Sequence, residues 1–357
     1  MRATRAALTA ALGIVVCVSG CTSAPPAPQP RIIDVGEPLF DTQEVAWAYG
    51  HELHYGARTF DLGKPVKEFD VSDYGFFVSL ADSDKPGASR HWFFFDGARS
   101  QPLGDHLTSV STSADGRYAG WVDRKGDTAP AGDIAGIVVV DLKTGGQIFA
   151  TSEGMGGEEG DDLVDRYEEL PPGFLGFDKG SKHAYWVNAS GGGERMRWRL
   201  GTDHVEPAEV SGSEPPMVPV GDPVHAYRGS PGTGSDSPVT LGNPSFSPSG
   251  TYVTDMSQTG RTQILDAQSG RQITVHFIAK AQYFAGWLPG DRFYVIGSKN
   301  PITDDNVDRA DLIPGAVEVC QLPQGTCVRG DRVPGMRDAL TPGDASVLLW
   351  STSEAMS

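Results

Sequence analysis

The chain has few cysteines, no long apolar segment after its first residues, and a shortage of basic side chains. Its 357 residues include 4 cysteines, and 29 lysines and arginines stand against 46 aspartates and glutamates, for a formal net charge of −17. Phosphate neutralisation needs clustered Lys and Arg, so this balance argues against nucleic acid as a partner. The same charge would repel anionic lipid from the surface of the body.

Motifs of catalysis and metal binding are also missing. The sequence has no Gly-x-Ser-x-Gly, no Gly-x-Gly-x-x-Gly and no Gly-Lys-Ser/Thr phosphate loop. His51 and His54 are three residues apart in a strand-like run, which turns them to opposite faces, whereas a zinc protease needs an i, i+4 pair on a helix. We expect no catalytic residue, no cofactor and no metal.

Asp304, Asn306 and Asp308 match part of a calcium-binding loop. These side chains have the alternating spacing of such a loop, but Arg309 stands at the glycine position and Gly315 at the position of the bidentate glutamate. The spacing alone does not predict a calcium site.

The first twenty residues have the layout of a secretory signal peptide. Arg2 and Arg5 form a basic start, and the apolar run from Ala7 to Val18 is too short to cross a bilayer, which needs about 20 residues. The run ends in Val18-Ser19-Gly20-Cys21, which resembles the lipobox of bacterial lipoproteins. The resemblance implies cleavage before Cys21 and a lipid on its thiol, and an ordinary signal peptide with an incidental cysteine is the alternative.

These features divide the chain into three parts. Residues 1–20 are the expected signal peptide, residues 21–34 a lipidated, proline-rich linker, and residues 35–357 the folded body. We therefore expect a lipid-anchored protein at the extracytoplasmic face of the cell membrane, held there by Cys21, since acyl anchoring is stable once more than one chain is attached.

The two remaining cysteines, Cys320 and Cys327, flank a Leu-Pro-Gln-Gly turn between two short β-type runs. That placement sets them opposite one another across a hairpin, and an exported protein meets an oxidising compartment. We expect a structural disulfide that contributes about 2.5 kcal/mol.

Two repeating units alternate along the body and predict an all-β fold. The first unit is a strand, a tight glycine turn and another strand, clearest around Gly116 and Gly250, with weaker copies around Gly75, Gly180, Gly290 and Gly343. The second is an apolar strand, a polar turn and a further strand, with copies near Asp61, Asp96, Asp141, Gly201, Asp266 and Cys320. Alternating inner and outer hairpins are typical of the four-stranded blades of a β-propeller.

The order of the units predicts how such a propeller would close. The body begins with the second unit and ends with the first, so the N- and C-terminal strands should share one blade, which removes two unpaired edges. We predict six blades, with seven as the alternative because the intervals around Gly180 are long.

The segment Pro244-Ser245-Phe246-Ser247-Pro248-Ser249-Gly250 resembles the repeat of TolB-type propellers, with Ser249 where that family has aspartate. The chain has no Trp-Asp pair of the true WD repeats. The resemblance implies a rigid scaffold whose loops bind a protein, a peptide or a glycan, although fold alone does not settle function.

Six of the seven tryptophans are interpreted as blade core rather than a sugar-binding platform, because they fall within the strand pattern. They are Trp92, Trp121, Trp186, Trp198, Trp287 and Trp350. Two insertions, Gly154 to Glu169 (residues 154–169, acidic) and Val210 to Leu241 (residues 210–241, rich in Pro, Gly and Ser), are predicted surface loops. Their roles stay open between ligand binding and none.

The sequence leaves three functional hypotheses. The first is a monomeric, non-catalytic binding or scaffolding module for a protein, peptide or glycan. The second is a propeller-type enzyme, such as a lyase, lactonase or cofactor-dependent dehydrogenase, with its active site at the channel mouth. The third is a structural accessory of a membrane complex or sensor kinase. Carboxylates or histidines gathered at the channel mouth would favour the enzyme.

Overall fold

The structure of the chain is a computed structural model that describes its body in detail. The described residues are 33–85, 87–124, 134–156, 167, 171–178, 180–189, 194–208, 247, 249–255, 262–300, 313–335 and 339–342. They form 22 β-strands, and within these ranges no helix is long and apolar enough to cross a membrane. The fold is therefore all-β, as predicted.

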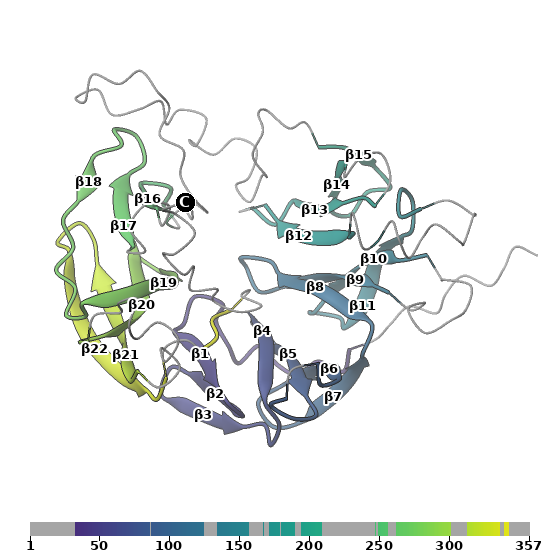
Figure 1. Ribbon diagram of the computed structural model, residues 1–357. Coiled ribbons are helices and arrows are strands. Elements are labelled where there is room, and N and C mark those ends of the chain that lie inside the picture. The colour runs from purple at the N-terminus through teal and green to yellow at the C-terminus, as the bar shows by residue number, and fades with distance from the viewer. Residues whose placement is uncertain are drawn as a thin grey trace, which may run out of the picture. The chain divides into compact units, whose positions relative to one another are not determined.

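The strands build six antiparallel sheets, which we number in chain order (Figure 1). Sheet 1 comprises β1 (Ala46–Tyr49), β2 (Glu52–Tyr55) and β3 (Arg58–Asp61); sheet 2 comprises β4 (Val66–Ser72), β5 (Gly75–Ala81), β6 (Arg90–Phe95) and β7 (Ser100–Gly104); sheet 3 comprises β8 (Leu107–Thr112), β9 (Tyr118–Asp123), β10 (Gly136–Asp141) and β11 (Gly146–Thr151). Sheet 4 comprises β12 (Gly173–Phe177), β13 (His183–Val187), β14 (Arg195–Arg199) and β15 (Val205–Pro207); sheet 5 comprises β16 (Tyr252–Asp255), β17 (Gln263–Asp266) and β18 (Gln272–Ile273); sheet 6 comprises β19 (Ala281–Leu288), β20 (Arg292–Ser298), β21 (Gly315–Gln321) and β22 (Thr326–Val333).

In every sheet the strands follow one another in chain order, each pairing with the next. The first strands of successive sheets also touch: β1 contacts β4, β4 contacts β8, and β8 contacts β12. Successive antiparallel sheets that meet along their first strands are consistent with a β-propeller.

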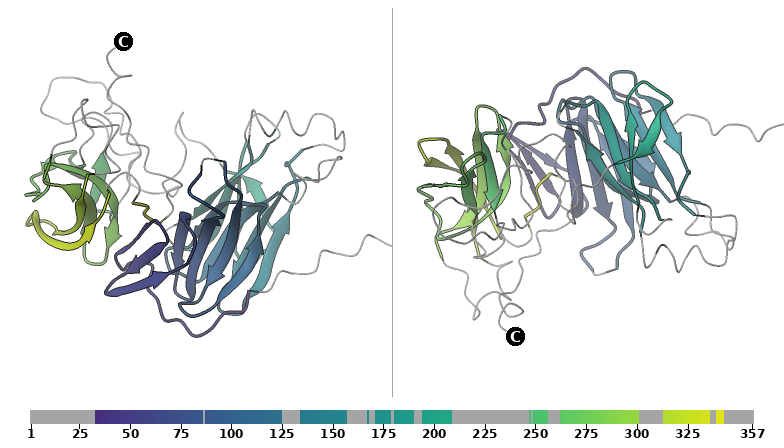
Figure 2. Two further views of the ribbon diagram at one scale, coloured as in Figure 1. Left: turned by 60° about the horizontal axis from the view of Figure 1, so that its bottom comes forward. Right: turned by 90° about the horizontal axis from the view of Figure 1, so that it is seen from above.

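The hydrophobic core lies between the sheets, which stand face to face (Figure 2). β5 illustrates this arrangement, because all its residues are buried and successive side chains point to opposite faces of sheet 2, where they pack into two different hydrophobic clusters. Phe76 packs into a cluster shared with sheet 1, and Phe77 into a cluster shared with sheet 3. The predicted core tryptophans agree with this arrangement, since Trp92, Trp121, Trp186 and Trp198 are buried in these inter-sheet clusters.

The hairpins match the predicted units with one exception. The turns at Gly75, Gly116, Gly180 and Gly290 join the first two strands of sheets 2, 3, 4 and 6. The prediction near Asp61 was wrong, because the outer hairpin of sheet 1 turns at Gly56, between β2 and β3, and Asp61 ends β3 before the chain crosses to sheet 2. The N–H of Leu62 donates to His51 O at 2.9 Å, so the pairing of the two strands continues past Asp61, where the sequence predicts a turn.

Residues near both ends of the body pack against distant strands. Ile33 is buried, and its N–H donates to Gly145 O at 2.8 Å, so this residue packs against sheet 3. Leu340 pairs antiparallel with Ala48 of β1 through two backbone hydrogen bonds of 2.9 and 3.0 Å. Cys320 and Cys327 are register partners in β21 and β22 and form a disulfide, in line with the predicted bridge.

Several sequence-based expectations concern residues outside the described ranges. They are the signal peptide with Cys21, most of the linker, most of the acidic insertion and all of the second insertion, the calcium-like spacing from Asp304 to Arg309, Trp350, and the last repeat at Gly343.

Candidate functional site

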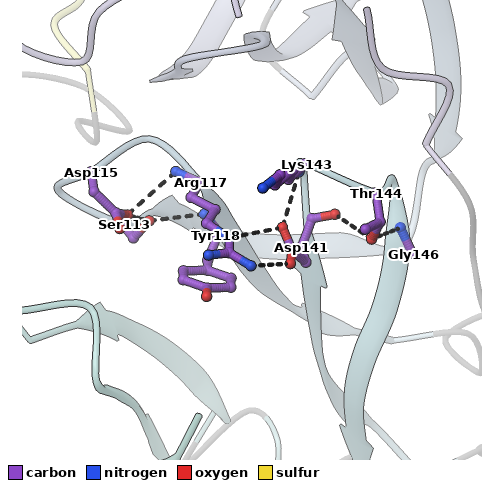
Figure 3. Close-up of polar contacts among 8 residues, drawn as sticks. All are labelled: Ser113, Asp115, Arg117, Tyr118, Asp141, Lys143, Thr144 and Gly146. Carbon is purple, nitrogen blue, oxygen red and sulfur yellow. Dashed lines mark hydrogen bonds and ion pairs between the residues drawn. The ribbon is translucent and has the colours of Figure 1, made fainter. Parts of the chain in front are cut away.

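The best-formed copy of the first repeat is a network of polar side chains in sheet 3 (Figure 3). Ser113 Oγ donates to Asp115 Oδ1 at 2.6 Å and accepts the N–H of Tyr118 at 2.9 Å, which closes the turn between β8 and β9. Arg117 reaches across to Asp141 at the end of β10, with Nη2 to Oδ2 at 2.7 Å and Nε to Oδ1 at 3.2 Å. These residues fix the two hairpins of the sheet to one another.

The ion pair with Arg117 favours the ionised form of Asp141. Burial alone would raise the pKa of this carboxyl, but the hydrogen bonds from the Arg117 guanidinium and from Lys143 N outweigh it and hold the pKa below its ordinary value. A carboxylate committed to a bidentate arginine is a structural element rather than a free catalytic base.

Sheet 5 carries the same turn with different side chains. Ser247 Oγ lies 3.1 Å from Ser249 Oγ and accepts the N–H of Tyr252 at 3.2 Å. Asp266, at the end of β17, accepts the N–H of Ser269 at 2.7 Å and its hydroxyl at 2.7 Å. Of the segment Pro244 to Gly250, which resembles the TolB-type repeat in sequence, the structure describes Ser247, Ser249 and Gly250, and these residues form this turn.

The two histidines that resemble part of a zinc motif are not brought together. His51 Nδ1 pairs with Asp61 Oδ1 at 2.8 Å, whereas the ring of His54 stacks on Trp47 with centroids 3.7 Å apart. Burial lowers the pKa of His54 despite the nearby Glu52 carboxylate. In the part of the chain that the structure describes, no group of three or more His, Cys, Asp or Glu could hold a metal ion.

Two carboxyls with perturbed pKa values lie on β4, the first strand of sheet 2. Desolvation raises the pKa of Glu68 to about 7 and that of Asp70 to about 6. Asp70 nevertheless has a structural task, because its Oδ2 accepts the N–H of Thr112 on β8 at 2.7 Å and Thr112 Oγ1 donates to Val71 O at 2.7 Å. The pair of hydrogen bonds joins sheets 2 and 3 along their first strands.

A cleft of about 700 Å³ lies at sheet 5. We call it the sheet 5 cleft, and it is lined by Thr262, Gln263, Ile264, Gln272, Ile273, Thr274, Val275, Phe277 and Gln282. None of these side chains is charged, although the whole chain carries a net charge of −17. Its volume falls within the usual range of small-ligand sites.

The cleft exists because the third strand of sheet 5 is very short. β18 pairs only with Ile264 and Leu265 of β17. The chain then leaves toward sheet 6, where the N–H of His276 donates to Gly325 O at 2.7 Å. Gly325 permits this crossing, since a Cβ there would lie 2.1 Å from Thr274 O and its φ is +66°.

Two buried polar side chains line the cleft. Thr262 is 4% exposed and its Oγ1 has no hydrogen-bond partner, and Gln282, on β19, is 7% exposed. A buried hydroxyl without a partner costs about 1–3 kcal/mol, so such a group is unusual unless something binds it. Phe277 adds an aromatic surface beside them.

Sequence reasoning missed this cleft. Gln272 and Thr274 alternate with Ile273 and Val275, and that pattern is typical of an ordinary half-exposed strand. The only signal was the shortness of the run after Ser269-Gly270.

No protein-family model matches the chain, and no curated protein matches it. Among solved structures it is similar to TolB from Acinetobacter baumannii, with 10% identity, a TM-score of 0.40, and coverage of 85% of this chain and 67% of that one. It is also similar to a prolyl endopeptidase (15% identity, TM-score 0.28, 72% of this chain and 34% of that one) and to a eukaryotic initiation factor (12%, 0.26, 85% and 66%). These likenesses concern the fold alone, and TolB, a β-propeller, is among the structural neighbours.

Proposed function

We propose that this protein is a non-catalytic binding module, anchored by lipid on Cys21 at the extracytoplasmic face of the cell membrane. Its partner is a protein, peptide or glycan, and the sheet 5 cleft is where the partner is held. The module acts as a monomer and does not bind nucleic acid.

The observation that carries this proposal is the uncharged, partly polar lining of the cleft. Thr262 and Gln282 offer a hydroxyl and an amide that are buried yet available, and Phe277 offers an apolar surface. Hydroxyl and amide groups suit a neutral polar segment, because a charged ligand would be desolvated there without an opposite charge.

Site-specific photo-cross-linking tests the proposal. A photoreactive residue at Thr274, on the exposed rim of the cleft, should give a discrete adduct in native membranes, and mass spectrometry would identify it as peptide, protein or glycan. The adduct should disappear with Gln282→Ala and persist with Gln268→Ala, an exposed glutamine in the turn of the same sheet. Equal labelling from Ser100, an exposed position on sheet 2, would contradict the proposal.

The anchor has its own test. A Cys21→Ala protein should lose its lipid and leave the membrane fraction. If that variant still partitions wholly with membranes, with only its signal removed, the anchor is not Cys21.

The proposed scaffold is a six-bladed propeller whose terminal strands share one blade. Its support is the pairing of Leu340 with Ala48 in the otherwise three-stranded sheet 1, together with the bond from Tyr294 Oη of sheet 6 to Ala46 O at 2.9 Å. Deleting the residues after Asp338 should lower the unfolding midpoint strongly and expose β1–β3 to hydrogen exchange, since a small isolated sheet is marginally stable. An unchanged midpoint and unchanged protection of residues 45–62 would exclude the shared blade.

A further inference from the structure

A second pocket, of about 450 Å³, lies at the end of sheet 6 where β20 stops and β21 begins. We call it the sheet 6 pocket; it is lined by Ser298, Lys299, Asn300, Pro314, Gly315, Arg329, Gly330 and Arg332. Its charged lining residues are three cations, and no carboxylate is among them. In a chain with a net charge of −17, this is a local reversal of sign.

The backbone of β22 brings the two arginines to one side. Arg329 and Arg332 are three residues apart, a spacing that would turn their side chains to opposite faces of a regular strand. The register, however, sets Arg332 opposite Ala316 and Arg329 opposite Glu318, so three steps of β22 span two steps of β21. This β-bulge inserts one residue and puts both arginines on the face shared by Ala316 and Glu318.

Lys299 reaches the pocket from the other side. It follows directly on Ser298, the last residue of β20, and Ser298 Oγ ties this end of the strand by donating to Pro314 O at 3.1 Å and accepting the N–H of Asn300 at 3.1 Å. The three cations thus come from two segments that flank β21 in the sheet.

Described carboxylates do not neutralise these cations. Within the described residues, no ion pair shorter than 4.0 Å involves Lys299, Arg329 or Arg332. Glu318 is opposite Arg329 in the register, but it is fully buried and its Oε2 accepts the N–H of Ile278 at 3.0 Å. Two other sources of carboxylate are close in the sequence: Asp331, an exposed residue between the two arginines on β22, and the aspartates between Asn300 and Ile313, which lie outside the described residues.

We propose that the sheet 6 pocket, through Arg329, Arg332 and Lys299, binds a phosphate group. Two arginine forks match the oxygens of a phosphate bidentately, and the lysine adds a point charge. The phosphate comes either from a free phosphate compound or from a phospholipid headgroup, and both present the same oxygens to the pocket. This site is separate from the uncharged sheet 5 cleft and does not depend on its role.

To test whether the pocket binds a free phosphate compound, the full-length chain in neutral detergent is titrated with inorganic phosphate and with pyrophosphate. To test a phospholipid headgroup, the Cys21→Ala chain, which lacks the proposed lipid anchor, is floated with vesicles of phosphatidylcholine, with and without an anionic phospholipid. The double variant Arg329→Gln/Arg332→Gln should weaken binding of whichever probe binds by about tenfold or more, because charge-assisted hydrogen bonds are the strong ones.

A matched pair of substitutions separates a site from general charge. Lys182→Gln/Arg199→Gln removes two exposed cations from sheet 4 and should change binding less than about twofold. Lys299→Gln alone, which leaves β22 untouched, should weaken binding by an intermediate factor and keeps the test valid if the double variant does not fold. Failure of the unmodified chain to bind either probe, or an equal loss in the matched pair, would overturn the proposal.

Discussion

Sheets 3 and 5 are built on the same turn, and they differ in the strands and side chains that come after it. In sheet 3 the serine turn continues into four full strands, and Arg117 bonds to Asp141 to tie its two hairpins together. In sheet 5 the serine turn is kept, but Ser249 and Thr251 replace the acid and the arginine, and β18 has only two residues. Where the repeat is complete the polar groups bind each other, and where it is cut short they line a cleft.

The difference suggests that two sheets built on the same repeat have different roles. In the complete sheet the serine, the acid and the arginine of the turn bind one another or the facing strand, as expected of a scaffold, although Trp121 Nε1 on β9 is buried without a partner. The incomplete sheet keeps a buried hydroxyl on Thr262 without a partner, which scaffolds normally avoid. Substitutions in the two sheets should therefore have unequal consequences, and these consequences can be measured.

The largest expected effect is at the turn of sheet 3. Gly116 has a φ of +65°, and a Cβ there would lie 2.2 Å from Asp73 Oδ1 and 2.6 Å from Asp73 N. Gly116→Ala should cost about 3 kcal/mol of unfolding free energy, from strained backbone and steric overlap together. Gly201→Ala, at a φ of +76° with open space around it, should cost about 1 kcal/mol. Urea unfolding of both variants checks this, and equal costs would show that the turn is not tightly packed against Asp73.

The next effect concerns pH and the bond between sheets 2 and 3. Burial raises the folded-state pKa of Asp70 from 3.8 to about 6, so the folded protein binds this proton more tightly than the unfolded chain. The stabilisation is full below about pH 4 and is lost as the pH rises through 6, by about 2 to 3 kcal/mol. Asp70→Asn should reduce this fall of the unfolding free energy and leave the part due to Glu68, whose pKa burial raises to about 7. Urea unfolding of the Asp70→Asn variant and of the unmodified chain from pH 4 to 7 measures the difference.

Sheet 5 should respond to pH in the opposite direction. The Ser269 hydroxyl and backbone N–H lower the pKa of Asp266, so its contribution is present near neutral pH and disappears as the pH falls through the lowered value. If Asp70→Asn and Asp266→Asn change the pH dependence of the unfolding free energy in the same sense, the raised pKa of Asp70 or the lowered pKa of Asp266 is contradicted.

The carboxylates that end β10 and β17 give a smaller contrast. Asp141→Asn breaks the bidentate pair between this buried carboxylate and an exposed arginine and should cost about 2 kcal/mol. Asp266→Asn removes bonds within a single exposed turn and should cost about 1 kcal/mol. Thermal unfolding of the two variants side by side is sufficient, and a larger loss at Asp266 would reverse the assignment of scaffold and site.

Much of this fold could be predicted from the sequence, because glycine turns and alternating strands are local signals. The turns at Gly116 and Gly290, the Cys320–Cys327 hairpin and the buried tryptophans all depend on short stretches of chain. The outer hairpin of sheet 1 was misplaced because Asp61-Leu62-Gly63 has the same turn chemistry as Tyr55-Gly56, and only pairing with β2 distinguishes them.

The candidate sites could not be predicted, since both depend on long-range geometry. The sheet 5 cleft arises where the chain after Ile273 leaves its own sheet for Gly325, which lies much further along the sequence. The sheet 6 pocket needs a bulge in β22 to align Arg329 with Arg332, and the spacing of these residues alone predicts the opposite arrangement. Departures from regular pairing created both features.

The smallest predicted effect is also the most direct test of the difference between the two sheets. Ser113→Ala in sheet 3 removes a hydroxyl that bonds to Asp115 and accepts from Tyr118, and should destabilise by about 1 kcal/mol. Thr262→Val in sheet 5 replaces a buried hydroxyl that has no partner by a methyl group of similar size, and should stabilise by about 0.5 to 1 kcal/mol. The same variant should lose the Thr274 cross-link, because a group kept at a cost to stability is kept for binding. A pair of thermal unfolding curves decides the matter: if Thr262→Val lowers the midpoint as Ser113→Ala does, the hydroxyl belongs to the scaffold and the cleft is an incidental gap in the repeat.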